Sequence, residues 1–150
     1  MTEPTQETAA PQISAGSLTS RAARLFAQAL TQAQQALHIV PAQYRILLEL
    51  WKQDGLAQKD LIERLHIEQS TIGNTLNRMV KDGLINRQPH PQDGRSQILS
   101  LTPQAIKLKD QAIRNACQVN EKALSSFSAE ERELFVSMMH RMIEALKAES

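Results

Sequence analysis

The 150-residue chain lacks several features that mark whole classes of protein. It has one cysteine, Cys117, so it can form neither an internal disulfide nor a zinc site built from several cysteines. Aromatic residues make up only 3% of the chain. No apolar run approaches the roughly 18 residues that cross a membrane. These absences predict a protein of the reducing cytoplasm with no membrane segment, no cofactor and no metal.

An excess of charge of one sign is also missing. The 17 Lys and Arg residues nearly balance 16 Asp and Glu, for a net charge of +1. The overall charge therefore does not indicate a nucleic-acid partner, and any electrostatic attraction must be local. The chain has no Gly-rich phosphate loop, no G-x-S-x-G and no HExxH motif, so we expect no enzyme.

The first residues differ in composition from the rest. Residues 1–16 carry two acidic residues, no basic residue and no apolar segment. This composition predicts a disordered tail rather than a signal peptide. The remaining residues, 17–150, have the length of one domain.

From residue 17 onward the apolar residues recur with helical spacing. A stripe over 17–37 predicts a long first helix. Pro41 favours the start of a second helix, and Asp54-Gly55 favours its end. Thr102-Pro103 and the capping box at 128–131 start two more long helices, over 103–123 and 128–147.

Two shorter helices are expected in the middle of the chain, over 58–64 and 69–82. The connection between them is so short that they must cross steeply, which is a helix-turn-helix. The second of them carries an apolar stripe and is closed by Gly83, a residue suited to a left-handed cap. The stripe consists of Ile72, Leu76, Met79 and Val80.

Two short strands, Leu84–Gln88 and Gln97–Leu101, follow the helix pair and predict a hairpin, or wing. The fold class is therefore mainly α (α+β): a winged helix-turn-helix with a two-stranded β-wing, flanked by long N- and C-terminal helices. An α-helix of this kind fits the major groove of double-stranded DNA.

The polar face of the 69–82 helix supplies the candidate contacts to DNA. Ser70 and Thr71 lie where a phosphate meets free backbone N–H groups. Gln69, Asn74 and Arg78 are candidates for base edges, since Asn and Gln pair with adenine and Arg with guanine. Asn77 also lies off the apolar stripe. The alternative is an ordinary solvated helix surface.

The wing tip is the second candidate contact. Asp93-Gly94 favours a turn that permits positive backbone dihedrals, and Arg95 follows it. A narrow minor groove attracts such an arginine. Arg87 contributes to a local excess of two positive charges between residues 78 and 95. The alternative is an ordinary exposed turn.

Two segments resemble the MarR family of transcription regulators. The run QSTIGNTLNRMVKDGLINR (69–87) is similar to that family's recognition helix and first wing strand. Asp93-Gly94-Arg95 with Leu101-Thr102 resembles its wing signature. The resemblance spans roughly residues 18–147 and is sharpest over about 58–103. It implies that Arg95 enters the minor groove and that Asp93 braces the loop.

The resemblance also implies a domain organisation and a homodimer. It assigns 17–40 and 103–148 to dimerisation helices and 41–102 to the DNA-binding lobe. A symmetric dimer presents two recognition helices about one duplex turn apart, so we expect a pseudo-palindromic operator. Repression of a promoter is the expected outcome. The alternative is a monomeric helical core.

Family members sense small aromatic or phenolic anions between the dimer helices and the DNA-binding lobe. This resemblance makes five residues candidates for an effector site: Arg24, His38, Tyr44, Arg45 and Trp51. The alternative is that Tyr44 and Trp51 belong to the core, because aromatic residues at helical spacing are usually packed inside.

Two other readings of the same scaffold stay open. One is a redox-responsive regulator that acts through Cys117, but a thiol needs a lowered pKa to react, which favours an inert residue at this position. A near-neutral winged helix can also serve as a protein-interaction module without specific DNA binding.

Overall fold

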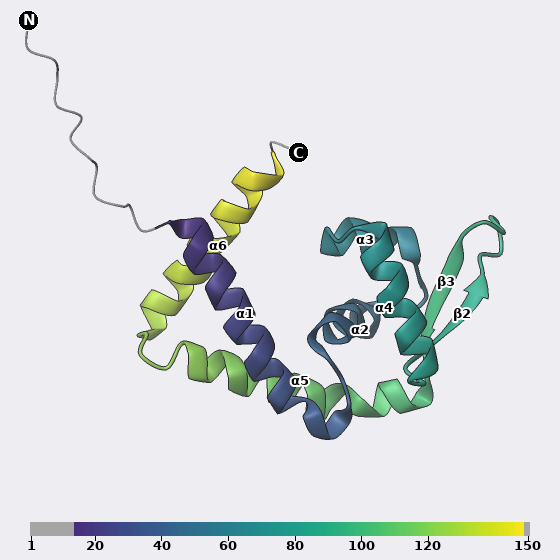
Figure 1. Ribbon diagram of the computed structural model, residues 1–150, viewed down its shortest axis with the longest axis horizontal. Helices are drawn as coiled ribbons and strands as arrows, with labels where there is room; N and C mark the ends of the chain where they lie inside the picture. The colour runs from purple at the N-terminus through teal and green to yellow at the C-terminus, as the bar shows by residue number, and fades with distance from the viewer. Residues whose placement is uncertain (1–13, 149–150) are drawn as a thin grey trace, which may run out of the picture.

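The computed structural model describes residues 14–148, and within them the chain forms two parts. Figure 1 shows one group of elements at the N-terminal end of α5 (Pro103–Ala123), while α1 (Ala15–Ala33) and α6 (Ala129–Lys147) lie toward its other end. We call residues 41–102 the winged lobe, and α1, α6 and the C-terminal half of α5 the helical arm. The elements are α1 (Ala15–Ala33), η1 (Gln35–Leu37), α2 (Pro41–Lys52), β1 (Leu56–Ala57), α3 (Gln58–Leu65), α4 (Gln69–Lys81), β2 (Ile85–Pro89), β3 (Gln97–Leu101), α5 (Pro103–Ala123) and α6 (Ala129–Lys147).

The predicted helix ends are mostly confirmed. Pro41 occupies the first turn of α2. The side chain of Thr102 caps α5, and Ser128 forms the expected capping box at the start of α6. Gly83 adopts the left-handed conformation with φ 74° after α4.

The first helix differs from the expectation at both ends. It begins at Ala15, two residues earlier than predicted, because the side chain of Ser14 accepts a hydrogen bond from the Ser17 amide. It ends at Ala33, and a short 3-10 turn follows. Ala15 and Gly16 are therefore helical, while residues 1–13 of the predicted disordered tail lie outside the described residues.

The wing belongs to a three-stranded antiparallel sheet with the order β1-β3-β2. β1 was not predicted, because two residues are too few to show the alternation that identifies a strand. In one row of the sheet, Leu99 of β3 pairs with Leu56 of β1 on one side and with Arg87 of β2 on the other. β2 also begins at Ile85 rather than at Leu84.

The hydrophobic core lies mainly in the winged lobe. α2 contributes Ile46, Leu47 and Leu50, and α4 buries three of its four predicted core residues, Ile72, Leu76 and Met79. Val80 was expected among them but is 40% exposed. Each residue turns a helix by about 100°, so Val80 lies about a quarter turn from Met79, beyond the edge of the core.

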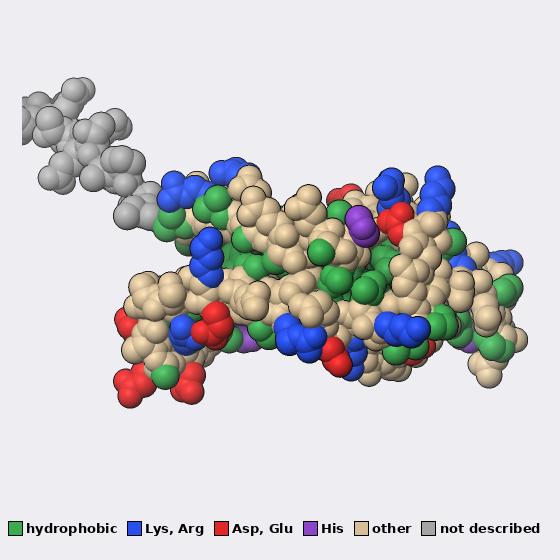
Figure 2. Space-filling model, turned by 90° about the horizontal axis from the view of Figure 1, so that it is seen from below, with side chains coloured by type: hydrophobic (Ala, Val, Ile, Leu, Met, Phe, Trp, Pro, Cys, Tyr) green, Lys and Arg blue, Asp and Glu red, His purple; other side chains and the backbone are tan. Residues whose placement is uncertain are grey.

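The helical arm buries much less of its apolar surface. Neither α1 nor α6 contains a buried residue, although both carry large hydrophobic side chains. Figure 2 shows hydrophobic side chains gathered along the hollow in the middle of the face seen from below. Among the described residues, no helix has the length and apolar character needed to cross a membrane. The exposed apolar residues of the arm include Leu18, Leu25, Phe26, Leu134, Phe135, Val136, Met138, Ile143 and Leu146.

Candidate nucleic-acid interface

The N-terminal half of α4 presents a polar surface that nothing else in the winged lobe covers. The turn before it passes through His66 in the left-handed conformation with φ 51°, which lets α4 leave α3 at a steep angle. Gln69, Ser70 and Asn74 are exposed, and their side chains have no hydrogen-bond partner within residues 14–148. These side chains are therefore free to meet an external ligand.

Asn77 and Arg87, two of the predicted contacts, are bound to each other. Nη1 of Arg87 on β2 donates a hydrogen bond of 2.7 Å to Oδ1 of Asn77 on α4. Nε of Arg87 is buried and has no partner among the described residues. The two side chains thus join the wing to the helix that precedes it.

Arg78 lies in the C-terminal half of α4, away from Gln69 and Asn74. Its Nε donates to Oδ2 of Asp82 at 3.3 Å. The same carboxylate oxygen accepts a 2.8 Å hydrogen bond from Nε2 of Gln43, a buried residue of α2. Sequence reasoning missed Gln43, because a polar residue buried in the first turn of a helix gives no periodic signal. Arg78 is therefore held at the end of α4 that faces α2.

The wing tip is braced by its own aspartate. Oδ1 of Asp93 accepts a hydrogen bond of 3.1 Å from the backbone N–H of Arg95, and the Asp93 carbonyl accepts one from Ser96. The turn does not use the positive dihedral that glycine permits at position 94: the glycines with positive φ among the described residues are Gly55 and Gly83. The side-chain hydrogen bond of Asp93 shapes the turn instead. The Arg95 side chain is exposed, so the braced loop carries a free guanidinium at its tip.

Comparison with known proteins agrees with this geometry. The model of the MarR family matches residues 39–97, which cover most of the winged lobe. The transcriptional regulator HosA of Escherichia coli O111:H- is 31% identical over 81% of this chain and 91% of its own. The organic hydroperoxide resistance transcriptional regulator of Bacillus subtilis is 33% identical over 73% of this chain and 74% of its own.

The chain belongs to the MarR family. It is therefore a DNA-binding transcription regulator and not an enzyme. The transcriptional repressor CouR, solved on a 23-mer DNA duplex, has the same fold. Its TM-score is 0.79 at 22% identity, over 87% of this chain and 92% of that one.

This MarR-family chain also has a cavity where its two parts meet. The cavity measures about 490 Å³ and lies between α1, α2 and α5. Tyr44 and Arg45 line it, together with Phe26, Leu30 and Asn120. Burial raises the pKa of the Tyr44 phenol, and its electrostatic interaction with Cys117 raises it further. Tyr44 therefore stays protonated and able to donate a hydrogen bond.

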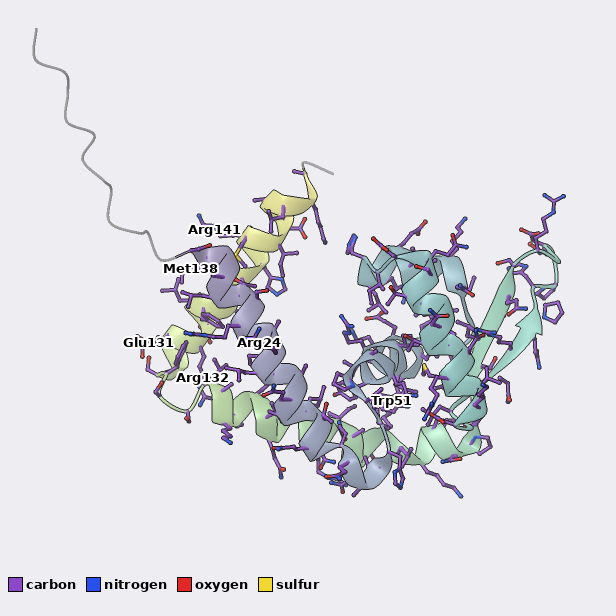
Figure 3. The ribbon with its side chains drawn as sticks, in the orientation of Figure 1. Arg24, Trp51, Glu131, Arg132, Met138 and Arg141 are labelled. Atoms are coloured by element: carbon purple, nitrogen blue, oxygen red, sulfur yellow. The ribbon has the colours of Figure 1, made fainter. Side chains whose placement is uncertain are left out.

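The other three predicted effector residues lie elsewhere. Trp51 packs edge-to-face on Tyr44, with ring centroids 6.1 Å apart, and is a partly buried residue packed against the core. His38 lies in a separate groove beside Arg78. Figure 3 shows Arg24 on α1, well apart from Trp51 on α2, and Arg24 lines a third hollow beside Ser17 and Arg21. Of the five candidates, only Tyr44 and Arg45 share a cavity.

Cys117 and the acidic residues do not form a further site. Cys117 is a free, exposed cysteine in α5. Within residues 14–148, no three His, Cys, Asp or Glu residues come close enough to hold a metal ion.

Proposed function

We propose that the protein is a cytoplasmic, homodimeric repressor that binds a pseudo-palindromic operator and is released by a small aromatic acid. The observation that carries DNA binding is the unpaired polar surface of α4 beside a braced, exposed Arg95. The side chains of Gln69, Ser70, Asn74 and Arg95 are exposed and have no partner within residues 14–148, so they are available to DNA.

The position of each side chain divides the contacts by kind. Gln69 and Asn74 lie toward the start of α4, the part of a recognition helix that reaches base edges. Ser70 and Thr71 bind a phosphate together with the free N–H groups of the first turn. Arg78, held at the far end of α4, is better placed for a backbone phosphate than for a base. Arg95 enters the adjacent minor groove.

Uncovered apolar surface on the helical arm supports a homodimer. Leu25 of α1 is 55% exposed and Leu134 of α6 is 58% exposed. Large apolar patches on a soluble chain mark contact surfaces. An apolar cavity of about 440 Å³ between α1 and α5, lined by Leu25, Phe26 and Val119, offers a place for side chains of a second copy.

A charge substitution tests the dimer. Leu134→Lys places an unpaired charge in the proposed interface and weakens the dimer by at least about tenfold. Val80→Lys, at an exposed apolar residue of α4 outside the arm, is the control and leaves the dimer unchanged. Sedimentation equilibrium measures both. A wild-type chain that stays monomeric at micromolar concentration contradicts the proposal.

The cavity between α1, α2 and α5 supports effector binding. Its walls are mainly apolar, and Arg45 supplies a positive charge for a carboxylate. A ligand there touches both the arm and the winged lobe. It can therefore bind more tightly to a conformation with one distance between the two parts than to a conformation with another. Aromatic carboxylic acids should raise the unfolding temperature of the wild type but not of Arg45→Ala. Arg114→Ala, which removes an arginine outside the cavity lining, should respond like the wild type.

DNA binding is tested by selecting duplexes from a random pool and measuring affinity at several salt concentrations. The proposal predicts an enriched inverted repeat and an affinity that falls steeply with salt, because counterions are released from DNA. Absence of any salt-dependent binding would favour a protein-interaction module instead.

The redox alternative has its own test. Cys117 is exposed, and one relative is named for organic hydroperoxide resistance. If peroxide releases the wild type from the selected duplex and Cys117→Ser abolishes that release, a redox effector replaces the aromatic acid. We expect peroxide to leave binding unchanged in both.

A further inference from the structure

The hydrogen bond between Asn77 and Arg87 lies at a row of the sheet where the wing is also supported by β1. β1 supports β3 only at two residues, Leu99 and Ile98. Arg87 is the direct partner of Leu99 on the other side of β3. The row through Leu56, Leu99 and Arg87 is thus held at both edges, by β1 on one side and by Asn77 of α4 on the other.

Beyond this row, the wing has less support toward its tip. The last paired residues are Pro89 and Gln97, and the loop that carries Arg95 follows them. A two-stranded ribbon twists readily and is marginal on its own. The position of Arg95 relative to α4 therefore depends on the residues nearest the tip at which each strand contacts the rest of the lobe. These are Ile98 of β3, which pairs with β1, and Arg87 of β2, which is bonded to α4.

Stability alone does not explain an arginine at this position. The bond to Asn77 is exposed, and exposed hydrogen bonds contribute little to folding. The buried Nε has no partner among the described residues, and an unsatisfied buried donor is unfavourable. The arginine therefore reaches α4 only by burying an unpaired Nε, which lowers the stability of the fold. A shorter polar or apolar side chain would avoid this loss.

We propose that Asn77 and Arg87 are positioning residues rather than DNA contacts. Their hydrogen bond fixes the wing at the angle to α4 that lets Arg95 enter the minor groove while α4 occupies the major groove. This inference rests on the proposed DNA binding and changes the role of two residues expected to touch DNA. It makes the contribution of Arg95 depend on Asn77.

A double-mutant cycle on the duplex selected by the wild type tests this dependence. Asn77→Ala removes the acceptor in a helix position that alanine favours, so folding should persist. We expect it to lower affinity roughly tenfold, and to reduce the further effect of Arg95→Ala to less than about twofold. Asn86→Ala, at an exposed asparagine of β2, is the matched control and should leave the effect of Arg95→Ala at its wild-type size.

Asn77→Asp separates positioning from DNA contact. A carboxylate at this position still accepts from Arg87, so positioning predicts that Arg95→Ala keeps its full effect in this background. Hydroxyl-radical footprinting should show minor-groove protection by the wing in the wild type and Asn77→Asp, but not in Asn77→Ala. Thermal unfolding of each variant verifies that it is folded.

The outcomes distinguish this inference from the proposed function. If the wild type selects no duplex, the proposed function fails and the positioning role fails with it. If the wild type binds but the effects of Asn77→Ala and Arg95→Ala are independent, only the positioning role is overturned. Loss of the Arg95 contribution in Asn77→Asp also overturns it, because an acceptor for Arg87 at position 77 would then not be what places Arg95.

Discussion

Nε1 of Trp51 donates a 3.1 Å hydrogen bond to the backbone carbonyl oxygen of Ala105. The bond joins α2 of the winged lobe to the first turn of α5, the helix that continues into the arm. Ala105 itself is fully buried. Trp51, one of the five effector candidates, therefore ties α2 to the start of α5, the helix that links the winged lobe to the arm.

Trp51→Phe should destabilise the protein while leaving effector binding intact. The substitution removes the indole donor and part of the buried surface, so we expect a loss of about 1 to 2 kcal/mol in the free energy of unfolding. Urea unfolding measures this loss, and titration with an aromatic acid measures binding. A variant as stable as the wild type that no longer binds the acid would show that Trp51 contributes to the effector site.

Arg95→Ala should weaken operator binding and reduce the slope of affinity against salt by about one unit, because one phosphate-neutralising charge is lost. Arg141→Ala removes an exposed arginine of α6, far from the wing (Figure 3), and should leave the slope unchanged. Fluorescence anisotropy over a range of salt concentrations measures both. Equal slopes for the two variants would mean that the wing tip does not reach DNA.

Gly83→Ala and Gly94→Ala should have opposite consequences for stability. Gly83 has φ 74°, and a Cβ there would lie 3.2 Å from Oε1 of Gln104, so alanine should cost about 1 kcal/mol or more. A Cβ at Gly94 meets nothing within 4 Å. Alanine at Gly94 restricts the unfolded chain and should be neutral or slightly stabilising. Thermal unfolding compares the two, and equal losses would contradict this account of the turns.

The capping box of α6 should make stability depend on acid. The Ser128 N–H donates to Oε1 of Glu131 at 2.9 Å, and hydrogen bonds from Ser128 hold the pKa of Glu131 below its ordinary value of 4.5. A lowered folded-state pKa stabilises the fold above 4.5 and ceases to do so as pH falls through the lowered value.

Above pH 4.5, Glu131→Gln should therefore be less stable than the wild type. The difference in free energy of unfolding should shrink as the pH falls through the lowered pKa of Glu131. Urea unfolding over a pH series measures this difference. Glu130→Gln, at the neighbouring acidic residue of the first turn, is the control. An equal pH dependence in the two variants would show that the capping box is not the cause.

The local parts of the fold were predictable from short patterns. Thr102-Pro103, Gly83 and the box at Ser128 act through backbone groups a few residues away, so their effect can be inferred from the sequence alone. The stripe of Ile72, Leu76 and Met79 correctly gave the buried side of α4, and thereby its exposed side. The identity of the DNA-facing helix follows from that pattern.

Relationships between distant segments were not predictable in this way. β1 is too short to show alternation and exists because its backbone pairs with β3, more than forty residues later. The buried Gln34 donates to the Ala112 carbonyl of α5 at 2.7 Å, which no local pattern predicts.

The sequence by itself determined which segments form helices, which face of α4 is polar and that an arginine follows the wing turn. Only the tertiary structure decided which polar residues remain free. Asn77 and Arg87 are bonded to each other, Gln43 of α2 donates to the Asp82 carboxylate at the end of α4, and Gln69, Ser70 and Asn74 stay unpaired. The reason is physical: a helical pattern gives the direction of a side chain, while its hydrogen-bond partner depends on which other segment packs beside it.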